Sequence, residues 1–225
     1  MARIVKEYSV RRDEILDAAQ KLIYSKGYEQ MTVQDILESV QIAKGTFYHY
    51  FDSKQTLLEA MIDHIMEQME TIVIPIIEDA NLPALEKLQQ FATTLDRWKA
   101  TQKSLLLAVL RVWYRDDNSL VREKMRLIGT RRFVPLVARI IQQGTDEGSM
   151  HTAYPNETAE IFFSMLQALE GSIGLLLIST ESAQEILQRA ERIATAFNSA
   201  LERILGVPVG SLTIVDPKTF QAWFS

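Results

Sequence analysis

Apolar residues recur at helical spacing along most of the chain. Between residues 11 and 25 they follow the i, i+3, i+4, i+7, i+8 pattern that places side chains on one face of a helix. These positions are Ile15, Ala18, Ala19, Leu22 and Ile23. Gly27 stands where such a helix would end. No run of alternating β-branched residues is long enough to indicate a sheet. The pattern therefore predicts an all-α fold.

Residues 32–58 predict two short helices, a tight turn at residues 41–42 and a third helix that begins near Ser53. Thr32 can cap the first of these helices, and Asp35 three positions later completes a pair similar to a capping box. The apolar residues of that helix share one face and are Val33, Ile36, Leu37 and Val40. This arrangement predicts a helix-turn-helix.

The helix after the turn, residues 44–50, separates its side chains by character. Phe47 can turn inward together with Ile42 and Phe51. The positions on the other side are Lys44, Gly45, Thr46, Tyr48, His49 and Tyr50. A two-turn helix that exposes a lysine, a threonine, a histidine and two tyrosines suits the DNA major groove better than water alone. This helix is therefore the predicted DNA-reading element.

Residues 44–58, KGTFYHYFDSKQTLL, resemble the recognition-helix signature of the TetR family of bacterial transcriptional regulators. In that signature a lysine, a small residue and a threonine precede an aromatic–Tyr–x–aromatic–Phe run, and Ser-Lys opens the next helix. The resemblance is strong over about the first sixty residues. It implies a helix-turn-helix DNA-binding domain at residues 1–52 and a larger helical ligand-binding and dimerisation domain at residues 53–225.

The resemblance also implies which residues contact DNA. The positions that match phosphate contacts are Thr32, Tyr48 and Lys54. The positions that match base contacts are Gln34, Lys44, Thr46 and His49. Gly45 permits the backbone to approach DNA closely, and Tyr50 can face either DNA or the core.

Two residues depart from the family pattern. Gln41 stands where the turn usually has a glycine, so it must accept strain or use another turn geometry. Ala43 stands where a serine is common, which removes a side-chain cap from the reading helix. Together these residues are expected to cost about 1–2 kcal/mol locally.

Helix breaks divide the rest of the chain into further helices. Their expected ranges are 53–74, 83–103, 104–114, 119–143, 156–179 and 182–205. Pro75 is expected to kink or end the first of these, and Asn156 and Ser182 are expected to cap the last two.

The net charge of −5 does not favour nucleic acid, but its distribution matters more than its sum. Residues 1–54 carry 8 basic and 8 acidic residues, so the acidic excess lies outside the helix-turn-helix. Because the helix-turn-helix segment is neutral, we expect modest non-specific affinity for DNA, and binding that depends on individually placed contacts. Residues 1–9 are either a frayed tail or an arm that touches the DNA backbone.

Catalytic motifs are missing from the sequence. It has no nucleophile elbow, phosphate loop, dinucleotide turn or paired-histidine zinc helix, and its three histidines are far apart. We therefore expect no enzyme activity, no cofactor and no metal site. The lack of cysteine suits a cytoplasmic protein. The apolar stretch 161–178 is interrupted by polar and small residues, which predicts a buried helix and no membrane span.

The larger domain has enough apolar and aromatic residues to line a pocket for an apolar or aromatic effector. The candidates are Trp98, Trp113, Tyr114, Phe133, Phe162 and Met165. Plain core packing is the alternative for each of them.

The last two long helices contain small residues at 171–174 between leucines, which permit close helix approach. The resemblance implies that these helices form a four-helix dimer interface, and packing within one chain is the alternative. The apolar tail after Gly210 is expected to fold back on its own body or on the partner.

The sequence therefore predicts a sequence-specific DNA-binding regulator, most simply a ligand-responsive repressor that acts as a homodimer on a palindromic double-stranded operator. The resemblance implies that ligand binding shifts the helix that begins at Ser53 and changes the separation of the two reading heads. A helical protein-interaction adaptor that keeps the fold without binding DNA is the alternative. Gln41 and the acidic remainder of the chain are its only support.

Overall fold

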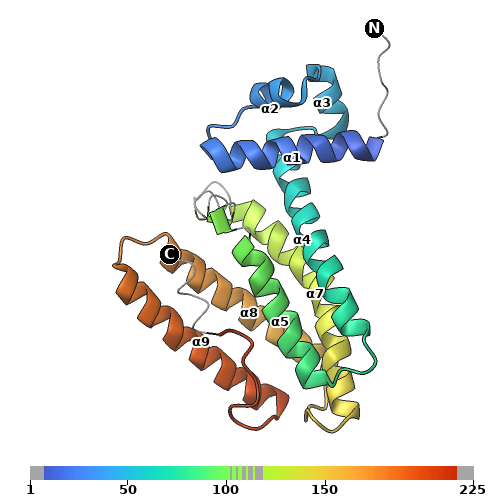
Figure 1. The fold of residues 1–225 in the computed structure, drawn as a ribbon, viewed down its shortest axis with the longest axis vertical. Coiled ribbons are helices and arrows are strands. Elements are labelled where there is room, and N and C mark those ends of the chain that lie inside the picture. The colour runs from blue at the N-terminus through green and yellow to red at the C-terminus, as the bar shows by residue number, and fades with distance from the viewer. Residues whose placement is uncertain are drawn as a thin grey trace. The chain divides into compact units, whose positions relative to one another are not determined.

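The computed structural model describes residues 8–101, 103–104, 106–107, 110, 114 and 119–216. These residues form helices and turns, with no strand among them, so the predicted all-α fold is confirmed. The helices, labelled in Figure 1, are α1 (Tyr8–Lys26), α2 (Val33–Val40), α3 (Lys44–Tyr50), α4 (Lys54–Glu78), α5 (Ala84–Thr101), α7 (Ser119–Asp146), α8 (Pro155–Leu177) and α9 (Ala183–Leu205). The expected helix at 104–114 lies mostly outside the described residues.

The chain folds as two compact units. The head comprises residues 1–65 and 104–125, and the body comprises residues 66–103 and 126–225. The helices α4 and α7 therefore contribute residues to both units. The division of the sequence into domains 1–52 and 53–225 stays a prediction.

The head is built around one apolar cluster, which the helical spacing of its residues explains. The cluster takes side chains from α1, α2, α3 and the first half of α4. Its members are Ile15, Leu16, Ala19, Ile23, Met31, Ile36, Leu37, Phe47, Phe51, Leu57, Leu58, Met61 and Ile62. Near the start of α7, Met125 packs against the cluster, and Lys124 forms an ion pair of 2.8 Å with Glu59 of α4. The head is therefore more than a three-helix unit.

The predicted cap of α2 is confirmed. The Thr32 hydroxyl accepts a hydrogen bond from the Asp35 amide at 3.1 Å, and the Asp35 carboxylate accepts one from the Thr32 amide at 2.7 Å. This reciprocal pair satisfies backbone donors that the first turn of a helix leaves open. It fixes where α2 begins.

The turn between α2 and α3 carries the expected strain. Gln41 adopts the left-handed conformation with φ 55° and ψ 50°, the one positive φ among described residues other than glycine. Ala43 is the N-cap of α3 and makes no side-chain cap bond. Both departures from the family pattern therefore have the structural consequence that the sequence indicated.

Replacing Gln41 with glycine is expected to stabilise the head by about 0.5–1 kcal/mol, since glycine accepts the left-handed conformation without a steric penalty. The measurement is the urea midpoint of unfolding. Gly27→Ala is the matched control: Gly27 has φ +82° and no atom within 4 Å of an added Cβ, so it isolates the backbone effect. It should lower the midpoint. A lower midpoint for Gln41→Gly would show that the turn is not strained by Gln41.

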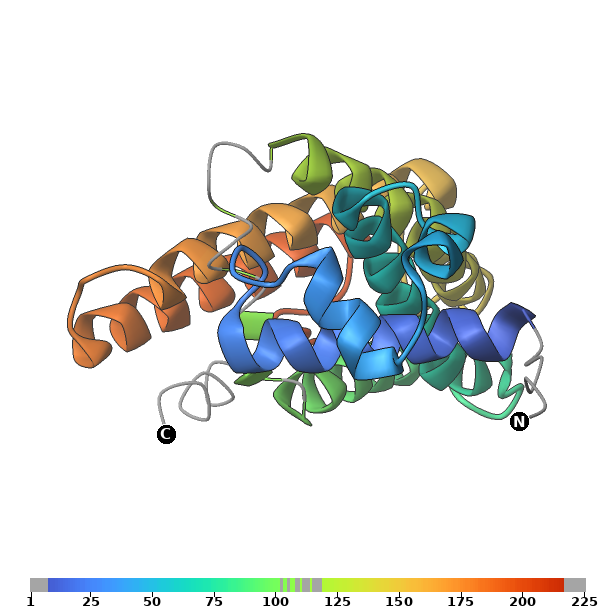
Figure 2. The same cartoon turned by 90° about the horizontal axis from the view of Figure 1, so that it is seen from above.

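In the body, the helices pack through aromatic contacts. Phe133 of α7 lies between Phe91 of α5 and Phe163 of α8, with ring centroids 6.3 and 6.1 Å apart. Phe162 of α8 meets Phe197 of α9 at 6.3 Å. The helices α8 and α9 lie side by side in both views (Figures 1 and 2).

The helix ends of the body confirm some predictions and correct others. Ser182 caps α9 through a capping box with Glu185, and Gly206 ends that helix in the left-handed conformation. Asn156 does not cap α8: the N-cap is Tyr154, without a side-chain bond, and α8 begins with proline, which suits a first helical position. Pro75 does not end α4, which continues to Glu78.

α8 is only partly buried. Its residues Ile161 and Leu175 are 52% and 51% exposed. By length and composition alone α8 is the one described helix that could cross a membrane, with a mean hydropathy of 1.4 in its most apolar window, 28% of which is buried. A core helix passes the same test, so this is weak support for a membrane segment. The expectation of a simply buried helix needs the correction that one face is open.

The segment after α9 folds back onto the body of its own chain, as far as Asp216. Leu212, Ile214 and Val215 are buried. Asn198 of α9 accepts hydrogen bonds from the Ile214 and Val215 amides and donates one to the Val215 carbonyl. Gln89 of α5 makes a similar pair with the backbone of Thr213. The apolar residues of the tail beyond 216 lie outside the described part of the chain.

Candidate nucleic-acid interface

The exposed face of α3 carries the predicted reading residues. Lys44, Gly45, Tyr48 and His49 are exposed, whereas Phe47 is fully buried. Thr46 and Tyr50 are half-buried. Tyr48 is 44% exposed, so it is not a core residue. The helix is thus anchored by one phenylalanine and presents basic, hydroxyl and aromatic groups outward.

Gly45 and Lys44 show how this face is built. A Cβ added to Gly45 would meet no atom within 4 Å, so packing inside the chain does not require a glycine there. The Lys44 ammonium lies 5.9 Å from the centre of the Tyr48 ring, a cation–π distance between two exposed residues of this helix.

At the start of α2, three donors converge on one carboxylate oxygen. Asp35 Oδ2 accepts from the Lys26 ammonium at 2.6 Å, from the Thr32 amide at 2.7 Å and from the Thr32 hydroxyl at 2.8 Å. The ion pair with Lys26 and the two bonds from Thr32 lower the pKa of Asp35 to about 2. The Thr32 hydroxyl proton is therefore committed to Asp35, and a phosphate at this point would have to compete for it.

Lys54, at the first position of α4, lies against the neighbouring loop. Its ammonium is 4.1 Å from the centre of the Tyr28 ring and donates to the Glu29 carbonyl at 3.3 Å. Burial lowers the pKa of Lys54, and the negative charges of Glu29 and Asp35 oppose this shift. The same burial, followed by the charge of Glu59, raises the pKa of Tyr28. The Lys54 charge is held in place before any partner arrives.

The remaining predicted residue, Gln34, is exposed on α2 and donates to Glu38 at 2.9 Å. The structure also adds a residue that the sequence did not indicate. α1 begins at Tyr8, earlier than expected, and the Tyr8 ring lies 4.6 Å from the Tyr50 ring and 5.8 Å from the His49 ring. Tyr8 precedes the stretch 11–25 in which the apolar pattern was found, so that pattern did not indicate this contact.

The described candidates for ligand binding lie in different environments. Phe133 and Phe162 are buried at 3% and 1% exposure, in different aromatic pairs. Trp98 of α5 and Met165 of α8 are half-buried, as is Tyr114. Trp113 lies outside the described residues. Their role in ligand binding stays a prediction.

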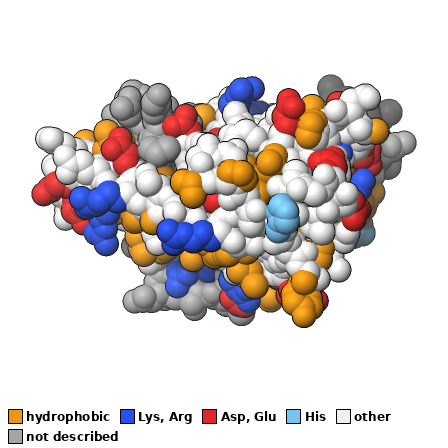
Figure 3. Space-filling model, turned by 90° about the horizontal axis from the view of Figure 1, so that it is seen from below, with side chains coloured by type: hydrophobic (Ala, Val, Ile, Leu, Met, Phe, Trp, Pro, Cys, Tyr) orange, Lys and Arg blue, Asp and Glu red, His pale blue; other side chains and the backbone are white. Residues whose placement is uncertain are grey.

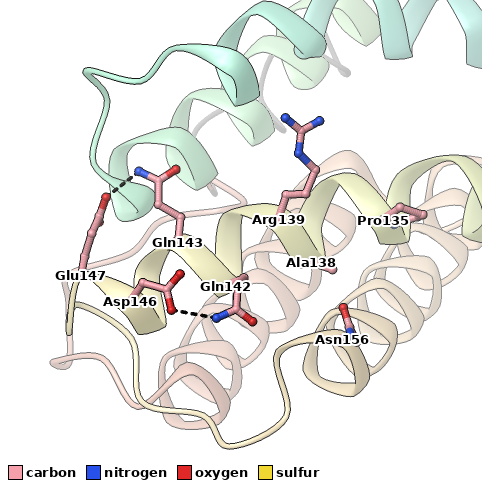
Figure 4. A pocket seen from close by; sticks show the side chains of 8 residues that line it. All are labelled: Pro135, Ala138, Arg139, Gln142, Gln143, Asp146, Glu147 and Asn156. Atoms are coloured by element: carbon pink, nitrogen blue, oxygen red, sulfur yellow. Dashed lines mark hydrogen bonds between the residues drawn. The ribbon is translucent and has the colours of Figure 1, made fainter.

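A shallow hollow of about 650 Å³ lies on α7 and the start of α8, and none of the six candidates lines it. Most of its lining residues have polar or charged side chains. Figure 4 shows that Gln142 is paired with Asp146 and Gln143 with Glu147. The Arg139 side chain extends away from those pairs.

Acidic and basic side chains are interspersed on the surface. On the face drawn in Figure 3, apolar side chains form small patches between acidic and basic ones. Within the described ranges, no group of three or more histidine, aspartate or glutamate side chains could hold a metal ion.

Two family models match the chain. The model for bacterial regulatory proteins of the tetR family matches residues 15–61, which include α2, α3 and the start of α4. The model for a tetracyclin repressor-like C-terminal domain matches residues 114–170. The chain belongs to the TetR family of transcriptional regulators. This family is not a class of enzymes.

Relatives of this TetR-family chain match it over only part of its length. An uncharacterised HTH-type transcriptional regulator of Lactococcus lactis is 44% identical over 59 residues, 25% of this chain and 30% of that protein. The negative transcriptional regulator IcaR of Staphylococcus aureus is 32% identical over 80 residues, 36% of this chain and 42% of IcaR. The matches thus span less than half of each relative.

A solved structure supports the fold over nearly the whole chain. The regulator RolR, in complex with resorcinol, is 17% identical with a TM-score of 0.61, and the match covers 96% of this chain and 93% of RolR. At this identity the likeness concerns the fold alone.

Proposed function

We propose that the protein is a sequence-specific DNA-binding repressor that acts as a homodimer on a palindromic operator and responds to a small molecule. The observation that carries the proposal is the face of α3: a buried Phe47 anchors the helix, while Lys44, Tyr48 and His49 are exposed around an unobstructed Gly45. A short helix with this division fits a major groove. The name of IcaR, a negative regulator, favours repression. Such a protein would work in the cytoplasm, where its DNA is.

The contacts divide by type. Tyr28 and Glu29 hold the Lys54 ammonium in one position, which suits a contact with one particular phosphate. Gln34, Lys44, Thr46 and His49 are proposed to reach base edges, with Thr32 and Tyr48 on phosphates. Tyr50 is half-buried and packs against the apolar cluster of the head, so we propose that it supports α3 and does not contact DNA.

The open face of α8 supports the homodimer. Ile161, Ala168 and Leu175 are exposed at spacings of seven residues, which places them along one side of the helix. An apolar row of this kind, beside the packed α9, suits association with a second copy. Dimerisation would present two copies of α3 to the two halves of a palindrome.

The effector is proposed to be apolar or aromatic. Trp98 and Met165 are half-buried in the body, and their side chains are of the kinds that contact aromatic ligands. RolR, whose structure holds resorcinol, is a relative in fold with an aromatic ligand. A coupling of about 1–3 kcal/mol between ligand and DNA would suffice for switching.

Lys44→Ala is expected to change which operator is preferred, because Lys44 is proposed to read a base edge. Discrimination at one base pair should fall by about 1–3 kcal/mol. The measurement is selection of bound duplexes from a random pool. Lys21→Ala, an exposed lysine of α1, is the control and should select the parent operator. If Lys44→Ala also selects it, Lys44 does not read bases.

Lys54→Ala is expected to weaken binding to every duplex and to reduce the slope of log affinity against log salt by about one. The reason is the loss of one phosphate contact without loss of base recognition. Titration of one operator at several salt concentrations measures this. Lys54→Arg keeps the charge and should keep the slope. An unchanged slope in Lys54→Ala would remove Lys54 from the phosphate set.

The same selection experiment with the full-length parent tests the proposed function itself. Recovery of a palindrome supports the regulator. Recovery of no preferred duplex by the folded protein, together with affinity that does not depend on salt, would favour the helical interaction adaptor instead.

A further inference from the structure

Three aromatic rings form a closed cluster at the edge of the reading face. The Tyr8 and Tyr50 ring centroids are 4.6 Å apart with planes tilted by 35°, and Tyr8 meets His49 edge-on at 5.8 Å and 83°. His49 and Tyr50 complete the cluster at 5.2 Å and 79°. Each pair lies within the range in which aromatic rings attract one another. Within the head, α3 lies over the amino-terminal half of α1, which brings Tyr8 to it (Figures 1 and 2).

Tyr50 anchors the aromatic cluster to the head, whereas His49 and Tyr8 are open to solvent. Tyr50 packs against the apolar cluster of the head, whereas His49 is exposed and Tyr8 is 56% exposed. In the described part of the chain, the His49 imidazole takes part in no hydrogen bond or ion pair, and its ring contacts are with Tyr8 and Tyr50. Tyr50 follows His49 on the same helix, so Tyr8 is the contact that comes from another element.

We infer that Tyr8 is a positioning residue for base recognition: its ring holds the His49 imidazole in one orientation on the exposed face of α3. This inference rests on the proposed DNA-reading function. An exposed helical side chain otherwise samples several rotamers. A histidine that reads a base must point one ring nitrogen at one base edge. A ring from α1 that closes on the imidazole reduces this freedom before DNA binds.

The role predicted for Tyr8 differs from a phosphate contact and from plain support of the fold. A phosphate contact would need the hydroxyl and would act on all sequences alike. Plain support would alter stability without a change of base preference. Positioning needs the ring alone and acts on the one base that His49 reads. Tyr8→Phe and Tyr8→Ala separate these roles.

The first arm of the test needs no DNA. Histidine-selective NMR labelling gives signals for the three histidines, His49, His64 and His151, and His49→Asn assigns the first. Tyr8→Ala should shift the His49 ring signals, because the ring current of Tyr8 is lost, and Tyr8→Phe should leave them near the parent positions. His64 and His151 are the internal controls. His49 signals that do not move in Tyr8→Ala would overturn the inference.

The second arm measures base preference by selection with the parent, Tyr8→Phe, Tyr8→Ala, His49→Ala and the double variant Tyr8→Ala/His49→Ala. Tyr8→Ala should reduce discrimination about 2- to 10-fold at the base pair that His49→Ala also relaxes, and nowhere else. Tyr8→Phe should retain the discrimination. In the His49→Ala background, Tyr8→Ala should have no further effect on preference.

The outcomes separate this inference from the function on which it rests. If the parent selects an operator and Tyr8→Ala keeps full discrimination, the inference fails and the DNA-reading function stands. If Tyr8→Phe weakens all duplexes equally, Tyr8 is a phosphate contact. If the parent selects no duplex, the proposed function fails, and the inference fails with it whatever the NMR signals show.

Discussion

Phe47→Ala should cost the head about 3–5 kcal/mol of unfolding free energy, the range for removing a buried phenylalanine side chain. Phe47 is fully buried, and its ring lies 5.4 Å from the Tyr48 ring and 5.9 Å from the Phe51 ring. It is the one side chain of α3 that the cluster buries, so its loss should leave α3 without an anchor. Hydrogen exchange of the α2–α3 amides and urea unfolding measure the effect. Operator binding should be lost with it.

Tyr48→Ala is the matched control, because Tyr48 is the next residue on the same helix but is 44% exposed. It should lower the unfolding free energy by less than about 1 kcal/mol and still weaken operator binding. A pair of variants that differ by one position thus separates support from contact. Equal urea midpoints for Phe47→Ala and the parent would contradict the assignment of Phe47 as the anchor.

The sequence was sufficient for α2 and α3 because the signals for these helices are local. The apolar spacing, the Thr32–Asp35 box and the division of α3 into one buried and several exposed residues all lie within one or two helical turns. The bounds of α2 and α3 were therefore predicted correctly. The strain at Gln41 followed from a residue type in a turn position, which is also a local signal.

Contacts between elements distant in sequence could not be predicted in the same way. The start of α1 at Tyr8 and its meeting with α3 depend on how two helices cross, which no periodicity records. Asn156 looked like a cap by type, but the chain before α8 places Tyr154 at the N-cap. The tail after Gly210 was expected to fold back, but its partners Gln89 and Asn198 are polar residues, and nothing in the sequence marks them as contacts of the tail.

Glu202→Ala should release this tail. Glu202 is 5% exposed, and its Oε1 accepts hydrogen bonds from the Gly210 amide at 2.8 Å and from the Leu212 amide at 3.2 Å. Hydrogen bonds to a charged group contribute more than neutral ones, and a buried amide left without a partner is costly. We therefore expect a loss of about 2–4 kcal/mol in unfolding free energy and faster hydrogen exchange at Gly210 and Leu212.

Glu202→Gln is the control, because its amide oxygen can still accept from both backbone donors. It should keep the tail in place and lose about 1 kcal/mol or less, the difference between charged and neutral acceptors. Leu212, Ile214 and Val215 of the tail are buried, so a release in Glu202→Ala should also expose these apolar side chains to a dye such as ANS. Slow exchange at both amides in Glu202→Ala would mean that Asn198 and Gln89 hold the tail without the carboxylate. The buried charge would then contribute nothing to the docking of this segment.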